Sequence, residues 1–143
     1  MCSFKAREKT VYIFWRRNPF SRKLDHYFLG VLCMLTRKVI RRILAELTDA
    51  CRKAPPSTVK VILFGSVARN DFDVDSDIDI MVVSTDIKEA KSFFGEIADE
   101  LFLKYFVPIS IVYVKPERLK FGDWFIQNVL REGKILWECG RMK

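Results

Sequence analysis

The segment formed by residues 59–83 constrains the fold and the function of this chain more than any other. It reads VKVILFGSVARNDFDVDSDIDIMVV: an apolar run, a Gly65-Ser66 pair, ten residues, and then Asp77 and Asp79 at the head of a second apolar run. Side chains in a β-strand alternate between the two faces of the sheet, so both aspartates project from the same face. The pattern therefore predicts two strands joined by a turn and a loop, with paired carboxylates at a strand end.

Paired carboxylates and the turn before them favour a site for a nucleotide and a metal ion. Two neighbouring carboxylates repel each other unless a cation lies between them, and a few hard oxygen ligands suit Mg²⁺ that is carried in with substrate phosphates. Gly65 lets the backbone approach a ligand closely, and Ser66 is expected to cap a short helix whose free amides attract anions. Arg69, about one turn later, can donate to a phosphate oxygen. We therefore expect this segment to bind a nucleoside triphosphate with Mg²⁺.

Alternating aspartates in the intervening loop favour a second interpretation, a calcium loop of the EF-hand kind. Asp71, Asp73 and Asp75 would occupy its first, third and fifth positions. Such a loop needs Gly where Ser76 stands, a bidentate Glu where Val82 stands, and flanking helices instead of strands. An isolated Asp-x-Asp pair can also do no more than solvate a strand end. The flanking strands and the Gly-Ser turn favour the nucleotide site over both alternatives.

The stretch LFGSVARNDFDVDSDIDIMVV resembles the signature of the polymerase-beta-type nucleotidyltransferase superfamily in its smallest form, the minimal nucleotidyltransferases that accompany HEPN-domain proteins as antitoxins. The likeness extends over residues 36–138. It implies that Gly65, Ser66 and Arg69 bind the triphosphate and that Asp77 and Asp79 are catalytic and bind two Mg²⁺ ions. The implied chemistry is transfer of a nucleoside monophosphate from ATP or another nucleoside triphosphate to an acceptor hydroxyl, with release of pyrophosphate.

Two positions depart from the family pattern. Asn70 replaces a glycine after the Ala-Arg pair, and Asn tolerates the left-handed conformation better than most residues. Ser110, in PISIVYV, stands where the third carboxylate of the catalytic pattern is expected. Serine is neutral and accepts a proton poorly, so we expect metal and nucleotide binding to persist while transfer is slow. The carboxylates that remain as candidate substitutes are Asp71, Asp73, Asp75 and Glu117.

Three classes of function follow from these residues. The first is a Mg²⁺-dependent nucleotidyltransferase that moves AMP from ATP to a hydroxyl of a partner protein, such as a tyrosine of a HEPN-type toxin. The second is a weakly active or inactive nucleotide-binding module that neutralises a helical partner by contact alone, which Ser110 favours. The third is a transferase for a small molecule or an RNA 3′ end; such enzymes usually carry an added domain that this sequence does not show.

The charge of the chain is concentrated near its beginning. Residues 1–42 contain eleven Lys or Arg and two acidic residues, a net charge of +9, whereas residues 43–143 carry 14 basic and 16 acidic residues, a net charge of −2. We therefore divide the chain into a basic extension over residues 1–33 and a nucleotidyltransferase domain over residues 34–143. The extension is interpreted as an arm that binds RNA or an acidic protein, as a solvated disordered segment, or as sequence upstream of a true start at Met34.

The remaining sequence predicts an α+β domain, a sandwich in which helices pack on a small mixed sheet. No apolar run is long enough for a membrane span, and four scattered cysteines are typical of free thiols in a reducing cytoplasm, so we expect a cytoplasmic protein without a membrane partner. Apolar periodicity and turn residues set the elements. We expect helices at 36–53, 87–105 and 123–131, the last ended by Gly133, and strands at 59–64, 77–83, 107–114 and 135–137.

Overall fold

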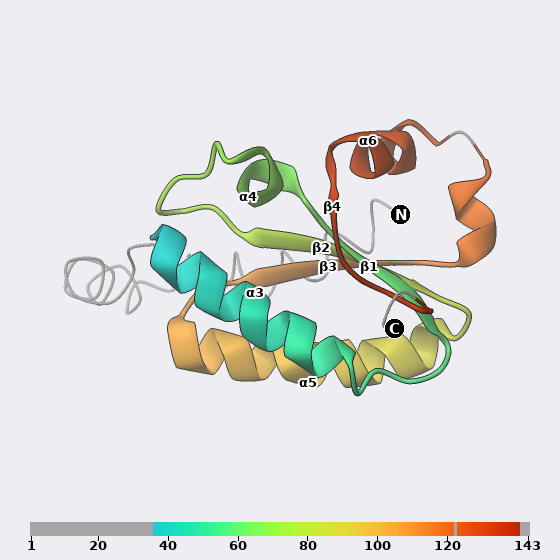
Figure 1. Cartoon of the computed structure of the whole chain (residues 1–143), viewed down its shortest axis with the longest axis horizontal. Helices are drawn as coiled ribbons and strands as arrows, with labels where there is room; N and C mark the ends of the chain where they lie inside the picture. The colour runs from blue at the N-terminus through green and yellow to red at the C-terminus, as the bar shows by residue number, and fades with distance from the viewer. Residues whose placement is uncertain (1–35, 122, 141–143) are drawn as a thin grey trace, which may run out of the picture.

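Four strands form a mixed sheet in the order β3-β2-β1-β4, and the strand that carries Asp79 lies inside it (Figure 1). β1 pairs antiparallel with β2 and β4, whereas β2 and β3 are parallel and need a helical crossover between them. The strands are β1 (Thr58–Phe64), β2 (Ile78–Ser84), β3 (Ile109–Val114) and β4 (Lys134–Glu138). The small mixed sheet expected from the sequence is confirmed.

The computed structural model describes residues 36–121 and 123–140. The proposed basic extension over residues 1–33 lies outside the described residues. Among the described helices there is none whose length and apolar character suit a membrane span. Cys51 and Cys139 are free thiols, as expected, and burial raises the pKa of the Cys51 thiol to about 12.

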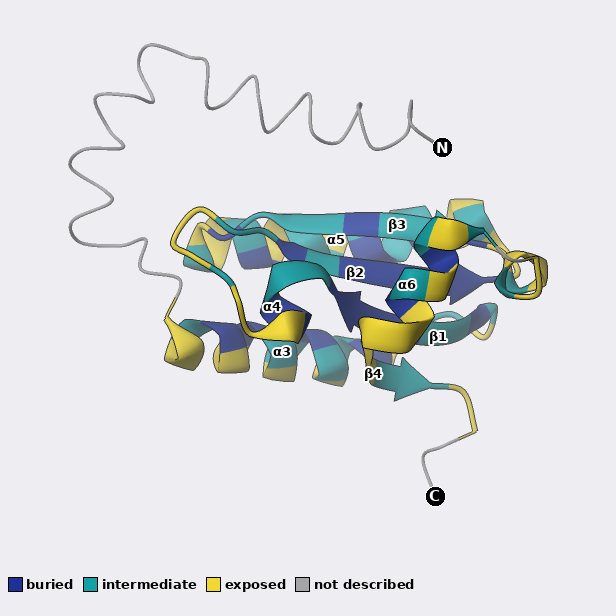
Figure 2. Cartoon of the chain, turned by 90° about the horizontal axis from the view of Figure 1, so that it is seen from above, coloured by how far each residue is buried: buried dark blue, intermediate teal, exposed yellow. Residues whose placement is uncertain are grey.

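Two long helices, α3 (Arg37–Cys51) and α5 (Ile87–Tyr105), cover one face of the sheet (Figures 1 and 2). Each begins at a side-chain cap: Thr36 Oγ1 accepts from the backbone N–H of Val39 at 3.2 Å, and Asp86 Oδ1 accepts from that of Glu89 at 3.1 Å. Such caps satisfy amides that the first turn of a helix leaves without intrahelical partners. α5 connects β2 to β3 and so provides the crossover that their parallel pairing requires.

The alternation predicted for β2 determines which side chains enter each half of the core. Ile78, Ile80 and Val82 point toward α3 and α5 and are buried with Phe94. The opposite face contains Met81 and Val83 with residues of α6 (Trp124–Glu132), and this is the face to which Asp79 belongs by strand parity. Fully burying an aliphatic side chain contributes about 1.5–3 kcal/mol, so both apolar rows of β2 stabilise its register.

The expected elements agree with the structure apart from small differences at their ends. The strand expected at 107–114 begins only at Ile109. Pro108, which precedes it, has no backbone N–H to donate. Its carbonyl oxygen accepts a hydrogen bond from the backbone N–H of Ile78 at 3.0 Å. A short 3₁₀ helix, η1 (Pro116–Leu119), was not expected. Gly133 caps α6 as predicted, but its φ is −72°; an added Cβ would lie 2.5 Å from Cγ2 of Ile62, so close packing explains this glycine.

Candidate active site

The turn at the end of β1 brings Gly65 against the carboxylate of Asp79. Gly65 has a φ of +77°, which L side chains rarely adopt, and a Cβ built on it would lie 2.4 Å from Oδ2 of Asp79. Two separate constraints therefore exclude a side chain at this position. The absence of a Cβ leaves the Asp79 carboxylate directly beside the backbone from which α4 (Gly65–Arg69) begins.

Asp79 lies in the middle of three adjacent strand positions. In the sheet register it is opposite Phe64 of β1 on one side and Ser110 of β3 on the other. Asp77 precedes β2 by one residue and shares the parity of Asp79; both residues are half-buried, and Oδ1 of Asp77 is shielded from solvent. The strand end therefore presents carboxylates on one face, as the sequence predicted.

The register confirms that Ser110 occupies the sheet position next to Asp79. Registered residues of neighbouring strands point to the same face, so a carboxylate at position 110 would stand beside Asp79. Side chains alternate along β3 as well: Val112 packs on the α6 face, and Ile111 packs on the face covered by α3 and α5. Among the described residues, no group of three His, Cys, Asp or Glu side chains is arranged to hold a metal ion. Two carboxylates and a hydroxyl suit a cation that obtains its remaining ligands from phosphate and water.

The short helix α4 follows the turn, but Ser66 does not cap it. The helix begins at Gly65, its cap position is Phe64, and no side chain caps its first turn. The expectation of a Ser66 cap was therefore wrong, because Ser66 is the second residue of α4 and lies within its first turn. The expectation for Asn70 is confirmed: it has a φ of 61° and ends α4 in the left-handed conformation. Ser66 remains a predicted triphosphate-binding residue.

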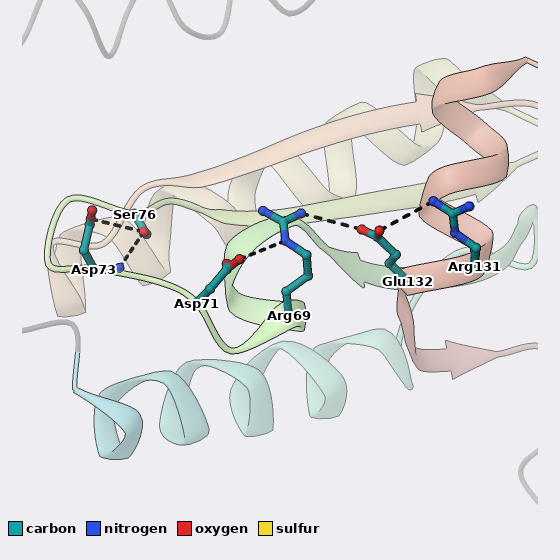
Figure 3. Close-up of polar contacts among 6 residues, drawn as sticks. All are labelled: Arg69, Asp71, Asp73, Ser76, Arg131 and Glu132. Atoms are coloured by element: carbon teal, nitrogen blue, oxygen red, sulfur yellow. Dashed lines mark hydrogen bonds and ion pairs between the residues drawn. The ribbon is translucent and has the colours of Figure 1, made fainter.

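Arg69, the last residue of α4, is held between two carboxylates (Figure 3). Its Nε donates to Oδ2 of Asp71 at 3.2 Å, and its Nη1 lies 3.7 Å from Oε2 of Glu132 at the end of α6. Glu132 also lies 3.6 Å from Nη2 of Arg131. Asp71, and less strongly Glu132, raises the pKa of Arg69 above its ordinary value. Arg69 therefore already contacts two anionic carboxylates.

Glu132 is a site-adjacent residue that the sequence analysis missed. It is far from Arg69 in the chain, and only the packing of α6 near α4 brings the two side chains together. No local pattern signals such a contact. In the sequence Glu132 is one more charged residue at the end of an amphipathic helix.

The acidic loop between α4 and β2 is organised by its own hydrogen bonds. Oδ1 of Asp73 accepts from the backbone N–H of Asp75 at 2.9 Å and from the Ser76 hydroxyl at 3.2 Å, while the backbone N–H of Asp73 donates to Ser76 Oγ at 2.9 Å (Figure 3). Asp71 binds Arg69. These contacts, and the strand that follows the loop, exclude the EF-hand geometry. They also engage Asp71 and Asp73 locally, which disfavours them as substitutes for the third carboxylate.

Aromatic residues near the site divide into supporting and exposed groups. The Phe125 ring packs edge-to-face against Phe64, with centroids 5.6 Å apart, and so anchors α6 to the strand that leads into the Gly65 turn. Trp124 is 78% exposed and Phe121 is 74% exposed. Trp124 is therefore accessible to a partner, whereas Phe125 is partly buried against the core.

Comparison with known proteins gives the same assignment for most of the chain. Residues 44–136 match the nucleotidyltransferase domain family. Two proteins of Methanocaldococcus jannaschii, both provisionally named protein adenylyltransferases, are 42% identical over 81 residues and 40% identical over 68 residues. The first alignment covers 54% of this chain and 77% of the relative, and the second covers 45% and 68%.

Solved structures share the fold. A toxin-antitoxin crystal structure with AMP-PNP aligns with a TM-score of 0.51 at 24% identity, covering 68% of this chain and 74% of that one. A crystal structure provisionally named a nucleotidyltransferase, from Sulfolobus solfataricus, aligns with a TM-score of 0.51 at 16% identity, covering 73% and 87%. The matched family spans the Gly65 turn, Asp77, Asp79 and Ser110, and the chain accordingly belongs to the nucleotidyltransferase domain family.

Proposed function

We propose that this protein transfers AMP from ATP, with Mg²⁺, to a hydroxyl group of a partner protein. The observation that carries the proposal is the contact at the strand end, where the Asp79 carboxylate lies against the Cα of Gly65 and beside Ser110 in the sheet. This arrangement supports the proposal because a carboxylate can bind a metal ion and lies next to a glycine turn, whose backbone a phosphate could approach closely. Protein as the acceptor class is supported by the names of the two relatives that are at least 40% identical.

Each group at the site has a distinct task in this proposal. Asp77 and Asp79 hold Mg²⁺, which, when bound, neutralises the triphosphate and polarises its phosphorus centre. The Gly65 turn admits the phosphates, and Ser66 contributes a hydroxyl and a backbone N–H to them. Arg69 exchanges a carboxylate for a phosphate oxygen and retains its charge throughout, because a guanidinium is not deprotonated in proteins.

The transfer itself requires a proton acceptor that Ser110 does not provide. The acceptor oxygen forms a bond to the α-phosphorus, the bond from that phosphorus to the bridging oxygen of pyrophosphate breaks, and the hydroxyl proton leaves. A serine hydroxyl is neutral and a poor base at neutral pH. We therefore propose that the proton passes to solvent or to a carboxylate of the acceptor protein, and that transfer without the acceptor protein is slow.

The partner in this proposal is a helical protein of the HEPN type. A domain of this size has little surface with which to enclose an acceptor of its own, so the acceptor hydroxyl arrives on another protein. One structural neighbour is a toxin-antitoxin structure with AMP-PNP, which supports a toxin as the partner class. Exposed aromatic residues such as Trp124 and Phe121 are suited to protein contacts.

A second candidate function is neutralisation of the same partner by contact without transfer. Two observations favour it: the neutral Ser110 beside Asp79, and the absence of any three-residue metal-ligand group among the described residues. In this case the nucleotide would serve only to order the site. The two functions differ in their dependence on the aspartates, because contact alone does not need a catalytic metal.

The decisive experiment is incubation of the purified chain with α-labelled ATP, Mg²⁺ and host lysate, beside the Asp77→Asn, Asp79→Asn double variant. A labelled protein band that appears only with the native chain would establish the proposed transfer and reveal the acceptor. A labelled RNA band would replace protein by RNA as the acceptor class. Absence of any band, together with Mg²⁺-dependent ATP binding and neutralisation of the partner by the double variant, would establish the contact-only function.

A further inference from the structure

The first two turns of α3 carry a dense basic cluster. Arg37, Lys38, Arg41 and Arg42 lie within six consecutive residues and are all exposed. The other two residues of this stretch, Val39 and Ile40, turn toward the core. The four cations therefore form one solvent-facing patch, here named the α3 basic cluster.

This arrangement is unfavourable for the helix itself. Arg37 and Arg41, and likewise Lys38 and Arg42, are like charges at the i, i+4 spacing, which destabilises a helix. They also lie at the helix N-terminus, where the macrodipole favours anions, and the first turn of α3 contains no acidic residue. The Thr36 cap and the buried face of α3 offset these costs, but neither explains why the cations are there.

Several Lys and Arg side chains elsewhere among the described residues form ion pairs, unlike those of the α3 basic cluster. Lys104 lies 2.8 Å from Glu46, Lys60 lies 3.2 Å from Glu138, and Arg118 donates to Asp123 at 2.7 Å. Within the described residues, no carboxylate lies within ion-pair distance of any member of the α3 basic cluster. Its four charges are therefore available to an external anion.

The composition of the patch identifies the class of anion. Protein interfaces usually contain an apolar centre, whereas interfaces with nucleic acid are polar and strongly positive. None of the exposed large apolar side chains of the described residues lies on α3. Three of the four cations are Arg, whose planar fork of donors matches phosphate oxygens. We propose that the α3 basic cluster binds the phosphate backbone of a nucleic acid, with single-stranded RNA as the probe.

The cluster lies at the end of the molecule that contains the candidate active site. In Figures 1 and 2, α3 begins at the same end as α4 and the acidic loop that leads into β2. The preceding residues 1–35 contain seven further Lys or Arg, so the positive charge continues along the sequence into α3. RNA bound to the cluster would thus approach the site end of the protein, while the proposed AMP transfer does not require it.

The test is titration of a fluorescein-labelled single-stranded RNA with the full chain, measured by fluorescence anisotropy over a range of salt concentrations. The Arg41→Gln, Arg42→Gln variant is compared with Arg52→Gln, Lys53→Gln at the other end of the helix, which removes the same net charge. Gln is a good helix former, so both variants are expected to fold, as circular dichroism will verify. We expect the first variant to bind about tenfold more weakly and to reduce the salt slope by about 1.4, and the second to change affinity less than about twofold.

Three outcomes would overturn the proposal. Equal losses in the two variants would show that RNA responds only to the net charge of the chain. Undetectable binding of the native chain at low salt would exclude an RNA site. Tighter binding to a polyglutamate peptide of similar length than to RNA would identify an acidic protein as the ligand. None of these results bears on AMP transfer, which the labelling experiment with the Asp77 and Asp79 variants tests separately.

Discussion

Two sets of acidic residues lie next to each other in the sequence and differ in what their carboxylates contact. In the loop, Asp73 accepts hydrogen bonds from Asp75 and Ser76, and Asp71 binds Arg69. At the strand end, Asp79 is fixed by the sheet register, lies beside Ser110 and faces the bare Cα of Gly65. The first set stabilises a loop, whereas the paired strands of the sheet place the second set against the Gly65 turn.

The comparison teaches that the density of acidic residues does not by itself identify the proposed metal site. Both sets have the Asp-x-Asp spacing, and the loop contains more aspartates than the strand end. The strand end differs from the loop because it belongs to a strand held in place by its neighbours. β2 pairs with a strand on each side, and its apolar residues are buried on both faces of the sheet. Sites built on such elements hold ligands more accurately than sites on loops.

Removal of one negative charge from each set of aspartates should produce the largest difference in AMP transfer. We expect Asp79→Asn to lower AMP transfer by about 10²-fold or more, because a metal contributes several kcal/mol and each 1.36 kcal/mol corresponds to a tenfold change in rate. Asp73→Asn keeps an oxygen that can accept from the N–H of Asp75, so transfer should change less than about threefold. Initial rates of label incorporation measure both; equal losses would contradict the distinction.

Much of the strand end was predictable because its determinants are local. Alternation along β2 and β3 requires only a period of two, whereas the family resemblance assigned Ser110 to the third-carboxylate position and the sheet register shows it beside Asp79. The boundaries of α5 also follow from its own residues, including the Asp86 cap. The family resemblance supplied the roles of these residues, and physical reasoning supplied their faces.

The contacts that escaped prediction arise from the packing of distant segments. Glu132 reaches Arg69 because α6 packs beside α4. The start of α4 was misjudged because the helix begins at Gly65, so Ser66 lies within its first turn and not at the cap position. A local sequence pattern does not show which distant segments pack together, nor the exact residue at which such a short helix begins.

Two separate Gly-to-Ala substitutions, one at the strand end and one in a helix, test whether the Gly65 contact with Asp79 requires glycine. Gly65→Ala forces a strained φ and a clash with the Asp79 carboxylate, so we expect a loss of about 1–3 kcal/mol in unfolding free energy together with loss of transfer. Gly95→Ala is the matched control, because this glycine of α5 has no neighbour within 4 Å of an added Cβ and should gain about 0.5–1 kcal/mol. Urea denaturation measures both; a stable, active Gly65→Ala variant would rule out the proposed contact.

Restoring the third carboxylate tests whether the strand end lacks only that group. We expect Ser110→Asp to raise the rate of AMP transfer by about tenfold, because it adds a metal ligand and a base beside Asp79. Ser110→Asn has nearly the same size without the charge and should give no gain. Single-turnover rates at saturating ATP and Mg²⁺ measure the effect. A gain in both variants, or in neither while ATP binding is retained, would assign Ser110 a role other than the missing carboxylate.

The smallest effect is expected for a third carboxylate, Glu46, whose replacement should change stability and leave AMP transfer unchanged. Glu46 on α3 accepts from Lys104 at 2.8 Å and from the Tyr105 hydroxyl, and these bonds lower the pKa of Glu46 below its ordinary 4.5. A carboxylate whose pKa is lower in the folded state stabilises the fold at pH values above its ordinary pKa. This stabilisation is lost as the pH falls through the folded-state pKa. The stability difference between the native chain and Glu46→Gln should therefore be small, greatest near neutral pH, decrease as the pH falls below about 4.5, and vanish once the pH is below the lowered folded-state pKa.

Thermal unfolding across pH measures this difference, and AMP transfer at neutral pH should be unchanged in Glu46→Gln. The control is the same substitution in a Lys104→Gln, Tyr105→Phe background, where Glu46 has lost both donors and its replacement should matter less at every pH. An equal effect in both backgrounds would show that the donors do not stabilise the carboxylate. Loss of transfer in Glu46→Gln would break the comparison, because it would connect a carboxylate engaged within the helical layer to chemistry that we assign to the strand end.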